Sequence, residues 1–290
     1  MAIATQLILN GIVAGAIYAL VASGFSLIYS VTKFMHIAHG AVLALSAYLM
    51  YTFAVQSGLN FWLAIVLTLF CSCLIGVLMN LLVYKPLRRR KASSAVLLIA
   101  SIAVLIFVNA LILAIWGADV KTINTRNPVF DFVGARITLI QTDIIVISIV
   151  LLFSLWLLMK RTKLGKAMRA VADNKDVAQT VGINPERIYT CTFLIGSFLA
   201  GVAGILIGIE QNLFPTMGSS LVIKGFTGAV IGSLASIPGA VLGSFILGLV
   251  ENIGIWWLPS GYKDAIAFVL LFIFLLFRPQ GLLGVKEREA

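Results

Sequence analysis

This chain of 290 residues has two histidines, His36 and His39. Their type and spacing make them the first candidates for a reactive pair. His36 and His39 lie three residues apart, so on a helix they would share one face. A metal site needs further ligands, and none is evident nearby in the sequence. We therefore expect the pair to gate a passage or to hydrogen-bond a helix end, and we expect no metal site.

Sequence motifs of common enzymes are missing. Gly165-Lys166 is followed by Ala167 and lacks the rest of the G-x-x-x-x-G-K-[ST] pattern that cradles nucleotide phosphates. There is no H-E-x-x-H, no Cys/His ligand cluster and no G-x-S-x-G. We expect a protein that is not an enzyme and that itself binds neither ATP nor another cofactor.

Glu210 and Glu251 are the two acids expected at membrane depth or at its edge. Carboxylates inside a membrane are costly and are functional by default. Both would lie near the outer ends of their helices, where solvent or pairing with Lys224 or Lys263 is the alternative explanation. A chain of buried acids suited to proton coupling is absent from the sequence, which argues against a proton-driven carrier.

These side chains belong to a sequence built for lipid. Hydrophobic residues make up 61% of the chain, charged residues 11%, and the mean hydropathy is +1.07. Several apolar runs exceed the roughly 18 residues of a spanning helix, and backbone groups inside a bilayer must be paired internally. We expect an all-α integral membrane protein of about eight transmembrane helices, with one transmembrane domain over residues 1–290. The net charge of +10 follows topology and does not require nucleic acid.

The expected spans are the apolar runs 6–29, 40–55, 61–84, 95–116, 142–159, 188–209 and 265–277. The first contains a G-x-x-x-G at Gly11 and Gly15, which lets a neighbouring helix approach closely. Because the start MAIATQ has no basic residue, we expect a retained first helix instead of a cleaved signal. The three cysteines fall within spans and are expected to pack as small apolar residues, with no disulfide; they are Cys71, Cys73 and Cys191.

Residues 224–257 are too short for two full spans and are rich in glycine. Pro238 divides them, and GAVIGS at 228–233 is repeated as GAVLGS at 239–244. We expect two short, tightly packed helices there, in the C-terminal half. Short apolar segments interrupted by Gly and Pro are the best sequence pointer to a transport pathway; close helix packing without a ligand is the alternative.

Basic residues are concentrated in two loops. Residues 85–91 carry five lysines and arginines and residues 160–187 carry seven, whereas residues 118–141 carry three that are offset by two acids. The positive-inside rule places the first two loops in the cytoplasm. Counting three spans back from residue 85 puts the N-terminus outside. The C-terminal tail is then cytoplasmic, with Arg278, Lys286 and Arg288.

The longest polar run, 160–187, has the pattern of folded structure. Apolar residues at 164, 167, 168, 171 and 172 recur at helical spacing. Asp173-Asn174 ends that helix and can cap a second one, which stops at Gly182. Asn184-Pro185 then opens the next span as N-cap and N1 proline. We expect two short amphipathic helices that dock a soluble partner; a basic loop that only sets topology is the alternative.

Seven stretches of the sequence occur in the order of a known family: NGIVAGAIYAL at 10–20, IAHG at 37–40, LGKAMRAVADN at 164–174, GIN at 182–184, LAGVAG at 199–204, GSLASIPGA at 232–240 and FRPQGLLG at 277–284. In these stretches the chain resembles the branched-chain amino acid ABC importer permeases of the LivH-like type. The resemblance implies a permease of the bacterial inner membrane that pairs with a second homologous permease subunit. It also implies two ATP-binding cassette ATPase subunits, which bind ATP and Mg, and an extracytoplasmic substrate-binding protein.

The resemblance also implies roles for individual residues. In such permeases the cytoplasmic loop with the R-A-V-A-x-[DN] pattern contacts the ATPase. ATP-driven closure of the ATPase pair would displace this loop and tilt the spans 142–159 and 188–209, which shifts the pathway from outward- to inward-open. The residues that inherit this coupling role are Arg169, Asp173, Asn174, Asp176, Ala178 and Gly182.

The substrate pathway is expected along the polar groups of the first span, the His39-Gly40 break and the glycine-rich region. The expected lining is Asn10, Tyr18, His39, Gly40, Gly228, Gly232 and Glu251. We predict the permease subunit of an ATP-driven importer for branched-chain or related small amino acids.

Three alternatives to this prediction stay open. Relatives often have Asn-Phe-Ala-His-Gly where this chain has His36-Ile37-Ala38-His39-Gly40, so a urea or short-chain amide importer of the same family is one of them. The others are an ATP-independent carrier or channel and a purely structural membrane scaffold.

Overall fold

The computed structural model describes residues 2–124, 127–132 and 134–284. The basic residues Arg126, Lys286 and Arg288, which the charge argument used, lie outside the described residues. The elements are α1 (Ala2–Thr32), α2 (His39–Tyr51), η1 (Thr52–Gln56), α3 (Phe61–Met79), η2 (Asn80–Tyr84), α4 (Lys85–Arg89), α5 (Ser94–Trp116), β1 (Val129–Phe132), β2 (Ala135–Thr138), α6 (Leu139–Arg161), α7 (Lys163–Asp173), α8 (Lys175–Thr180), α9 (Pro185–Glu210), α10 (Met217–Gly232), α11 (Ile237–Gly254), η3 (Ser260–Tyr262) and α12 (Lys263–Phe277).

The prediction of a helical membrane protein is confirmed. Within the described residues, seven helices are long and apolar enough to cross a membrane, in approximate agreement with the expected eight. Two further apolar helices are shorter: α10 has 16 residues, and α2 has 13 before it widens into the π-helical turn η1. The expected span 40–55 is therefore α2 followed by η1.

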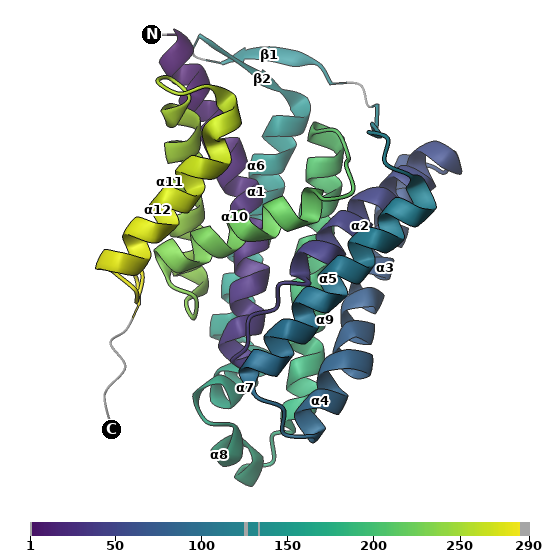
Figure 1. The fold of residues 1–290 in the computed structure, drawn as a ribbon, viewed down its shortest axis with the longest axis vertical. Coiled ribbons are helices and arrows are strands. Elements are labelled where there is room, and N and C mark those ends of the chain that lie inside the picture. Colours follow the sequence, from purple (N-terminus) through teal and green to yellow (C-terminus); the bar gives the residue numbers. More distant parts are fainter. Residues whose placement is uncertain (1, 125–126, 133, 285–290) are drawn as a thin grey trace.

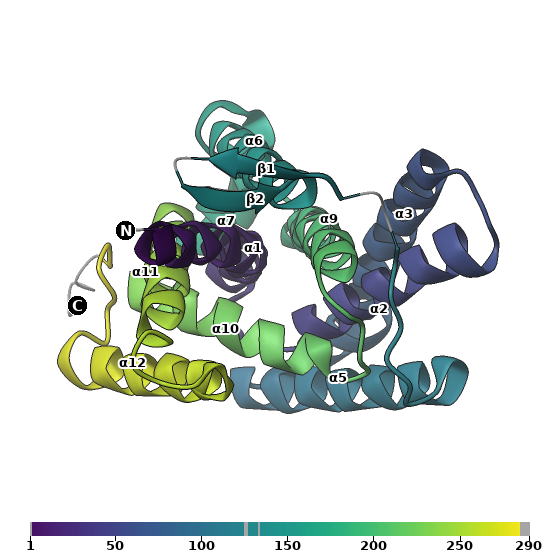
Figure 2. The ribbon, with the colours of Figure 1, turned by 90° about the horizontal axis from the view of Figure 1, so that it is seen from above.

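Most of the long helices run roughly along the long axis of the molecule, α1 passes through its middle, and α10 lies across it (Figure 1). Seen from above, α9, α10 and α11 surround α1, while α5 and α12 lie along one flank (Figure 2). Burial follows this order, because 89% of the α1 span is buried inside the protein against 6% of the α12 span. The inner helices form the core, and the outer ones present apolar surface to their surroundings.

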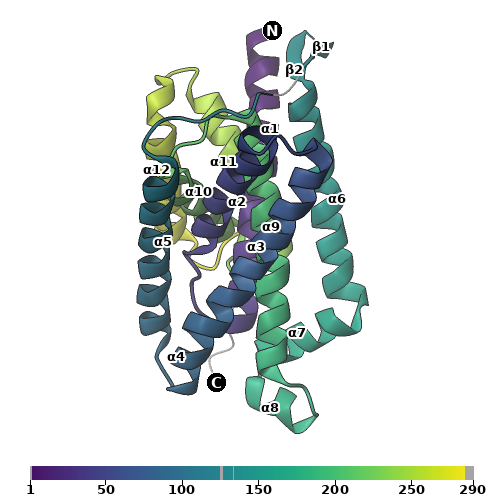
Figure 3. The same cartoon turned by 90° about the vertical axis from the view of Figure 1, so that its right-hand side faces the viewer.

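The two predicted cytoplasmic loops lie at the same end of the molecule. Figure 3 shows α4, α7 and α8 together at the lower end, and the N-terminus with the β1–β2 hairpin at the upper end. The hairpin pairs Val129 with Thr138 and continues to Phe132 with Ala135. It corresponds to the short β-like runs of the sequence between residues 118 and 141.

Glycines bring the inner helices into backbone contact. A methyl group on Gly248 of α11 would lie 2.5 Å from the amide nitrogen of Gly15 and 2.6 Å from the carbonyl oxygen of Gly11, so no side chain fits. The G-x-x-x-G of the first span therefore lies against α11, as the sequence predicted for a close helix neighbour. Gly40 of α2 and Gly218 of α10 face each other with the same lack of space.

The glycine-rich region forms two packed helices, but its boundaries differ from the prediction. The first helix, α10, begins at Met217 instead of near residue 224, and the turn lies at Ser233–Ser236. Pro238 does not break a helix, because it stands in the first turn of α11, where the missing amide hydrogen is not needed. Here Ser236 caps α11 by accepting a hydrogen bond from the Gly239 amide at 3.3 Å.

Replacing Gly248 by leucine should weaken the contact between α1 and α11. Overpacking typically costs about 1–3 kcal/mol, so we expect the detergent-purified Gly248→Leu chain to unfold several degrees below the wild type in a thermal melt. Gly261→Leu is the matched control, because a side chain there meets no atom within 4 Å. Equal melting temperatures for Gly248→Leu and wild type would contradict the packing described.

Candidate functional site

Charged side chains from three helices meet at Tyr18 of the central helix α1. The hydroxyl of Tyr18 (α1) donates a 2.8 Å hydrogen bond to Glu251 Oε2 (α11), and Lys224 Nζ (α10) lies 3.4 Å from Glu251 Oε1. Lys224 also lies 3.0 Å from Asp264 Oδ1, in the first turn of α12. We call Tyr18, Lys224, Glu251, Asp264 and Lys263 the charged cluster.

The charged cluster compensates for the free-energy cost of burying the Glu251 carboxylate. Glu251 has no exposed surface and the Lys224 side chain is 12% exposed, whereas the Asp264 side chain is 63% exposed. A buried charge is tolerated only when it is paired and hydrogen-bonded. The alternative explanation of Glu251, pairing with Lys224, is what the structure shows. Asp264 was not predicted from the sequence to belong to this cluster. The one sequence signal for it is its position beside Lys263 at the start of the last span.

A cavity of about 240 Å³ lies beside the charged cluster. Its wall combines α1, the segment after α9, the first half of α10 and the start of α12. Tyr18, Lys224 and Lys263 line it together with apolar side chains and the amides of Gln211 and Asn212. This space is enough for several water molecules or a small solute.

The predicted pathway residues do not form one site. The structure brings Tyr18 and Glu251 together, but Asn10 lies apart and its amide oxygen accepts a 3.1 Å hydrogen bond from Gln6. Gly228 packs against Ser244 and Gly232 against Gly239, at the crossing of α10 and α11. In the structure these two glycines therefore make helix contacts.

The histidines form a separate buried group in the break between α1 and α2. His36 lies before the helix and only His39 begins α2, so the expectation of a shared helix face is wrong; the chain leaves the helix at Lys33 with φ 58°. His36 Nδ1 lies 3.0 Å from the Tyr84 hydroxyl. Neither ring nitrogen of His39 makes a hydrogen bond of ordinary geometry, although the Val21 backbone lies close to the ring.

Glu210 lies at the end of α9, away from the charged cluster. Its Oε1 accepts a 2.9 Å hydrogen bond from Gln141 Nε2 of α6. The carboxylate therefore joins two helix ends. Among the described residues, no group of three or more His, Cys, Asp or Glu side chains is arranged to hold a metal ion.

The loop between α6 and α9 has the predicted local structure. Asn174 Oδ1 accepts hydrogen bonds from the amides of Asp176 and Val177, both at 3.0 Å, and so caps α8. Gly182 ends it in the left-handed region at φ +83°, and Asn184 caps α9 ahead of Pro185. Met168 and Val171 are buried, and α7 packs on α1, α6 and α9.

Most of the predicted coupling residues face outward. The exposed ones are Arg169, Asp173, Asn174, Asp176 and Gly182, whereas Ala178 is buried and holds α8 in place. Sequence reasoning assigned no role to Val177 and Val181, which are 58% and 70% exposed. Val177 lies in α8, and Val181 is the residue that directly follows it. An exposed apolar pair at the tip of a polar loop fits a protein contact.

A second feature missed by the sequence reasoning ties the two basic loops together. Arg88 Nη2 of α4 lies 3.0 Å from Glu186 Oε2 at the start of α9 and 2.8 Å from Asn80 Oδ1. Its guanidinium also stacks 4.7 Å from the centre of the Tyr189 ring. We call Arg88, Glu186 and Asn80 the loop brace. Asn80 begins η2, and π-helical turns of this kind often occur at functional positions.

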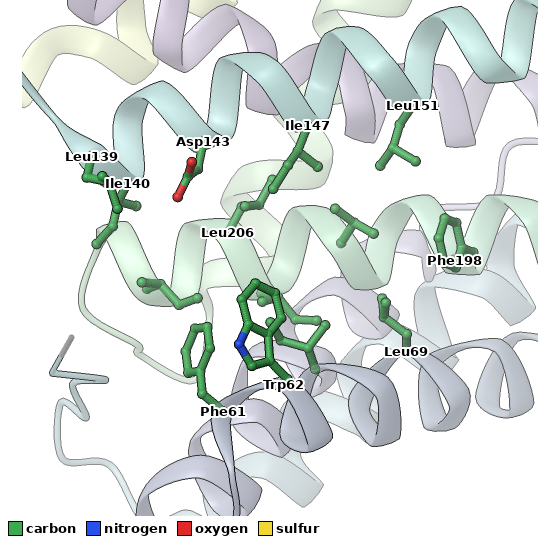
Figure 4. Close-up of a pocket in the computed structure, with 14 residues that line it drawn as sticks. Phe61, Trp62, Leu69, Leu139, Ile140, Asp143, Ile147, Leu151, Phe198 and Leu206 are labelled. Atoms are coloured by element: carbon green, nitrogen blue, oxygen red, sulfur yellow. The ribbon is translucent and has the colours of Figure 1, made fainter. Parts of the chain in front are cut away.

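A hollow of about 630 Å³ lies between α3, α6 and α9 and is almost entirely apolar (Figure 4). Asp143 is the acidic side chain in its wall and points into it, among Leu139, Ile140 and Ile147. Only 22% of the α3 and α6 spans is buried inside the protein. We therefore attribute this hollow to the outer, lipid-facing side and not to the functional site.

Long apolar helices around a buried central helix, charges paired between them, and an exposed capped loop at one end define a multi-pass membrane permease. Residues 7–275 match the family model "Branched-chain amino acid transport system / permease component". The chain belongs to this family.

Three of the similar proteins match over almost their whole length. The chain is 34% identical to the "High-affinity branched-chain amino acid transport system permease protein BraD" of Pseudomonas aeruginosa, over 98% of this chain and 97% of the relative. It is 31% identical to the corresponding LivH protein of Escherichia coli, over 98% and 96%. It is 30% identical to the "Probable branched-chain amino acid transport permease protein LivH" of Methanocaldococcus jannaschii, over 98% and 94%.

Replacing Lys224, which pairs with the buried Glu251, should lower the thermal stability of the protein. In Lys224→Met, Glu251 stays buried without its partner, which typically costs about 3–5 kcal/mol. We expect a clear fall in the thermal midpoint of the purified chain. The double variant Lys224→Met/Glu251→Leu should recover most of the loss, because both buried charges are then gone. If both variants melt alike, the pairing is not what holds these helices.

Proposed function

We propose that the chain is the permease subunit of an ATP-driven importer of branched-chain or related small amino acids in the bacterial inner membrane, and that residues 1–290 act as one transmembrane domain. The observation that carries the proposal is similarity over 98% of the chain to transport permeases named for these substrates. The exposed capped loop between α6 and α9 adds a place for a driving subunit. The relatives do not favour the urea alternative.

The partners follow from the same proposal. The sequence contains no phosphate-binding motif, so ATP and Mg would be bound by two separate ATP-binding cassette ATPase subunits. A second homologous permease subunit would complete the membrane part, and an extracytoplasmic binding protein would deliver the substrate. Membrane lipid surrounds the outer helices, and no nucleic acid is involved.

Coupling in this proposal runs through α7 and α8. The exposed Arg169, Asp173 and Asp176, with Val177 and Val181 on the tip, would contact the ATPase. Because α7 packs on α1, α6 and α9, a displacement of the docked loop would pass directly to those helices. Asn174, Ala178 and Gly182 would keep the loop in a fixed shape, since they cap, anchor and end α8.

The remaining predicted sites stay proposals. We propose a pathway that passes Tyr18 and Glu251 of the charged cluster and the His39-Gly40 break, with Asn10 nearer the end of α1. Gly228 and Gly232 would contribute by allowing α10 and α11 to lie close together. The N-terminus would lie outside and the C-terminus in the cytoplasm.

The experiment that tests the proposal is uptake of labelled leucine and labelled urea into proteoliposomes. The vesicles hold this chain, its partner permease, the ATPase subunits and the binding protein, with or without ATP inside. We expect leucine uptake that requires ATP. Uptake of urea alone would replace the substrate, and equal leucine flux without ATP would overturn the importer in favour of a carrier or channel. A complex with no solute flux would favour a structural scaffold.

Charging the tip of α8 should uncouple transport. We expect Val177→Asp to lower ATP-driven leucine uptake at least tenfold, because a carboxylate would replace an apolar contact, while the protein still inserts and purifies normally. Gln179→Asp is the matched control, since residue 179 is exposed on the opposite face of the same helix. Arg169→Ala and Asp173→Ala should also reduce uptake. If the Val177→Asp variant takes up as much leucine as the wild type, the loop does not couple transport to the ATPase and only sets topology.

The proposed orientation predicts which end an impermeant label reaches. In a chain freed of its three cysteines, a cysteine replacing Asp131 of β1 should react with membrane-impermeant maleimide added to intact spheroplasts. A cysteine replacing Lys175 of α8 should react only after the membrane is opened. If the cysteine at position 175 reacts in intact spheroplasts and the one at position 131 reacts only after the membrane is opened, the orientation is the opposite of the proposed one.

A further inference from the structure

The cavity beside the charged cluster is lined by both polar and apolar side chains. The polar ones are Tyr18, Lys224 and Lys263, with Gln211, Asn212 and Ser220. The apolar ones come from α1, from the end of α9 and the segment after it, and from the first part of α10: Ala14, Ile17, Ile207, Phe214, Met217 and Leu221. A lining that offers both kinds of contact suits a small solute that has one charged end and one hydrocarbon end.

The two lysines differ in how far their donors are used. Lys224 Nζ donates hydrogen bonds to the Tyr18 hydroxyl at 3.3 Å and to Glu251 Oε2 at 3.5 Å, and it forms an ion pair with Asp264 Oδ1 at 3.0 Å, so each of its three N–H groups has a partner. Among the described residues, Lys263 Nζ donates one hydrogen bond, to Asn252 Oδ1 at 3.1 Å. Two of its N–H groups are therefore left for the cavity that it lines.

The local charge is balanced around the cavity. Lys224 and Lys263 contribute two positive charges, and Glu251 and Asp264 contribute two negative ones. A solute with a net charge would upset this balance, whereas a zwitterion would not. A carboxylate at Lys263 would gain charge-assisted hydrogen bonds in a partly desolvated place, where they are strongest.

From this arrangement we propose that the cavity is a transient binding site for the transported amino acid. Lys263 holds the α-carboxylate, Lys224 supports it through the field of the charged cluster, and the apolar wall takes the hydrocarbon side chain. The inference rests on the proposed import of amino acids and adds the chemistry that the permease itself reads. Urea and simple amides, which have no carboxylate, would not be held.

The first test replaces Lys263 in the complete complex. Lys263→Gln keeps an amide that can still donate to Asn252 but removes the charge, and Lys263→Arg keeps the charge. We expect Lys263→Gln to lower the leucine transported per ATP hydrolysed at least tenfold in proteoliposomes, and Lys263→Arg to retain most of it. ATP hydrolysis stimulated by the binding protein should persist in both, which shows an assembled complex. Lys121→Gln, a charge removed outside the cavity, is the matched control.

The second test uses the wild-type complex and so does not depend on a variant that folds. Labelled leucine is bound to the detergent-purified complex without the binding protein, and unlabelled leucine or leucinamide competes. We expect leucine to displace the label and leucinamide, which lacks the carboxylate, to be at least tenfold weaker. Equal competition, or no leucine binding at all, would overturn the site.

The outcomes separate this inference from the proposed function. If the wild-type complex shows no ATP-dependent leucine uptake, the proposed function itself fails. If wild-type uptake is normal and Lys263→Gln transports as much leucine per ATP as the wild type, only the carboxylate site is overturned.

Discussion

Close backbone contact between α1 and α11 is the constraint on which the rest of the structure depends. Inside lipid, helices gain no hydrophobic drive toward each other, so they associate through packing and polar contacts. Gly11, Gly15 and Gly248 remove the side chains that would hold the two helices apart. Only at this separation does the Tyr18 hydroxyl come within 2.8 Å of Glu251. The glycines thus determine where a charge can be buried in this bundle.

The central helix also joins the two ends of the molecule. Midway along its length α1 supplies Tyr18 to the charged cluster, and it also contacts α7, which lies at the end of the molecule opposite the N-terminus. In the proposed coupling, a displacement of α7 would therefore pass to the charged cluster through a single helix of 31 residues. The proposed substrate site and the proposed docking loop would then need no long chain of side-chain contacts between them.

Local features could be predicted from the sequence, and distant ones could not. The caps at Asn174 and Asn184 and the stop at Gly182 depend on neighbours within four residues, so their spacing was sufficient. Glu251 also bonds to Tyr18, 233 residues away, and no pattern in one sequence reveals such a pair. The spacing of His36 and His39 suggested a shared helix face, but the chain leaves the helix at Lys33 and His36 lies before α2, so the two rings meet outside a common helix, with their centroids 6.1 Å apart. Hydropathy gave the spans, while their mutual arrangement came from glycine contacts that depend on the whole bundle.

The loop brace has a mechanical consequence. Arg88 joins α4 to the first turn of α9 through Glu186, and it also bonds to Asn80, which follows directly on α3. In the proposed coupling, a displacement of α8 that moves α9 would either move α3 with it or first separate the Arg88–Glu186 ion pair. The brace would thus reduce the number of helices that can move independently when the loop is displaced.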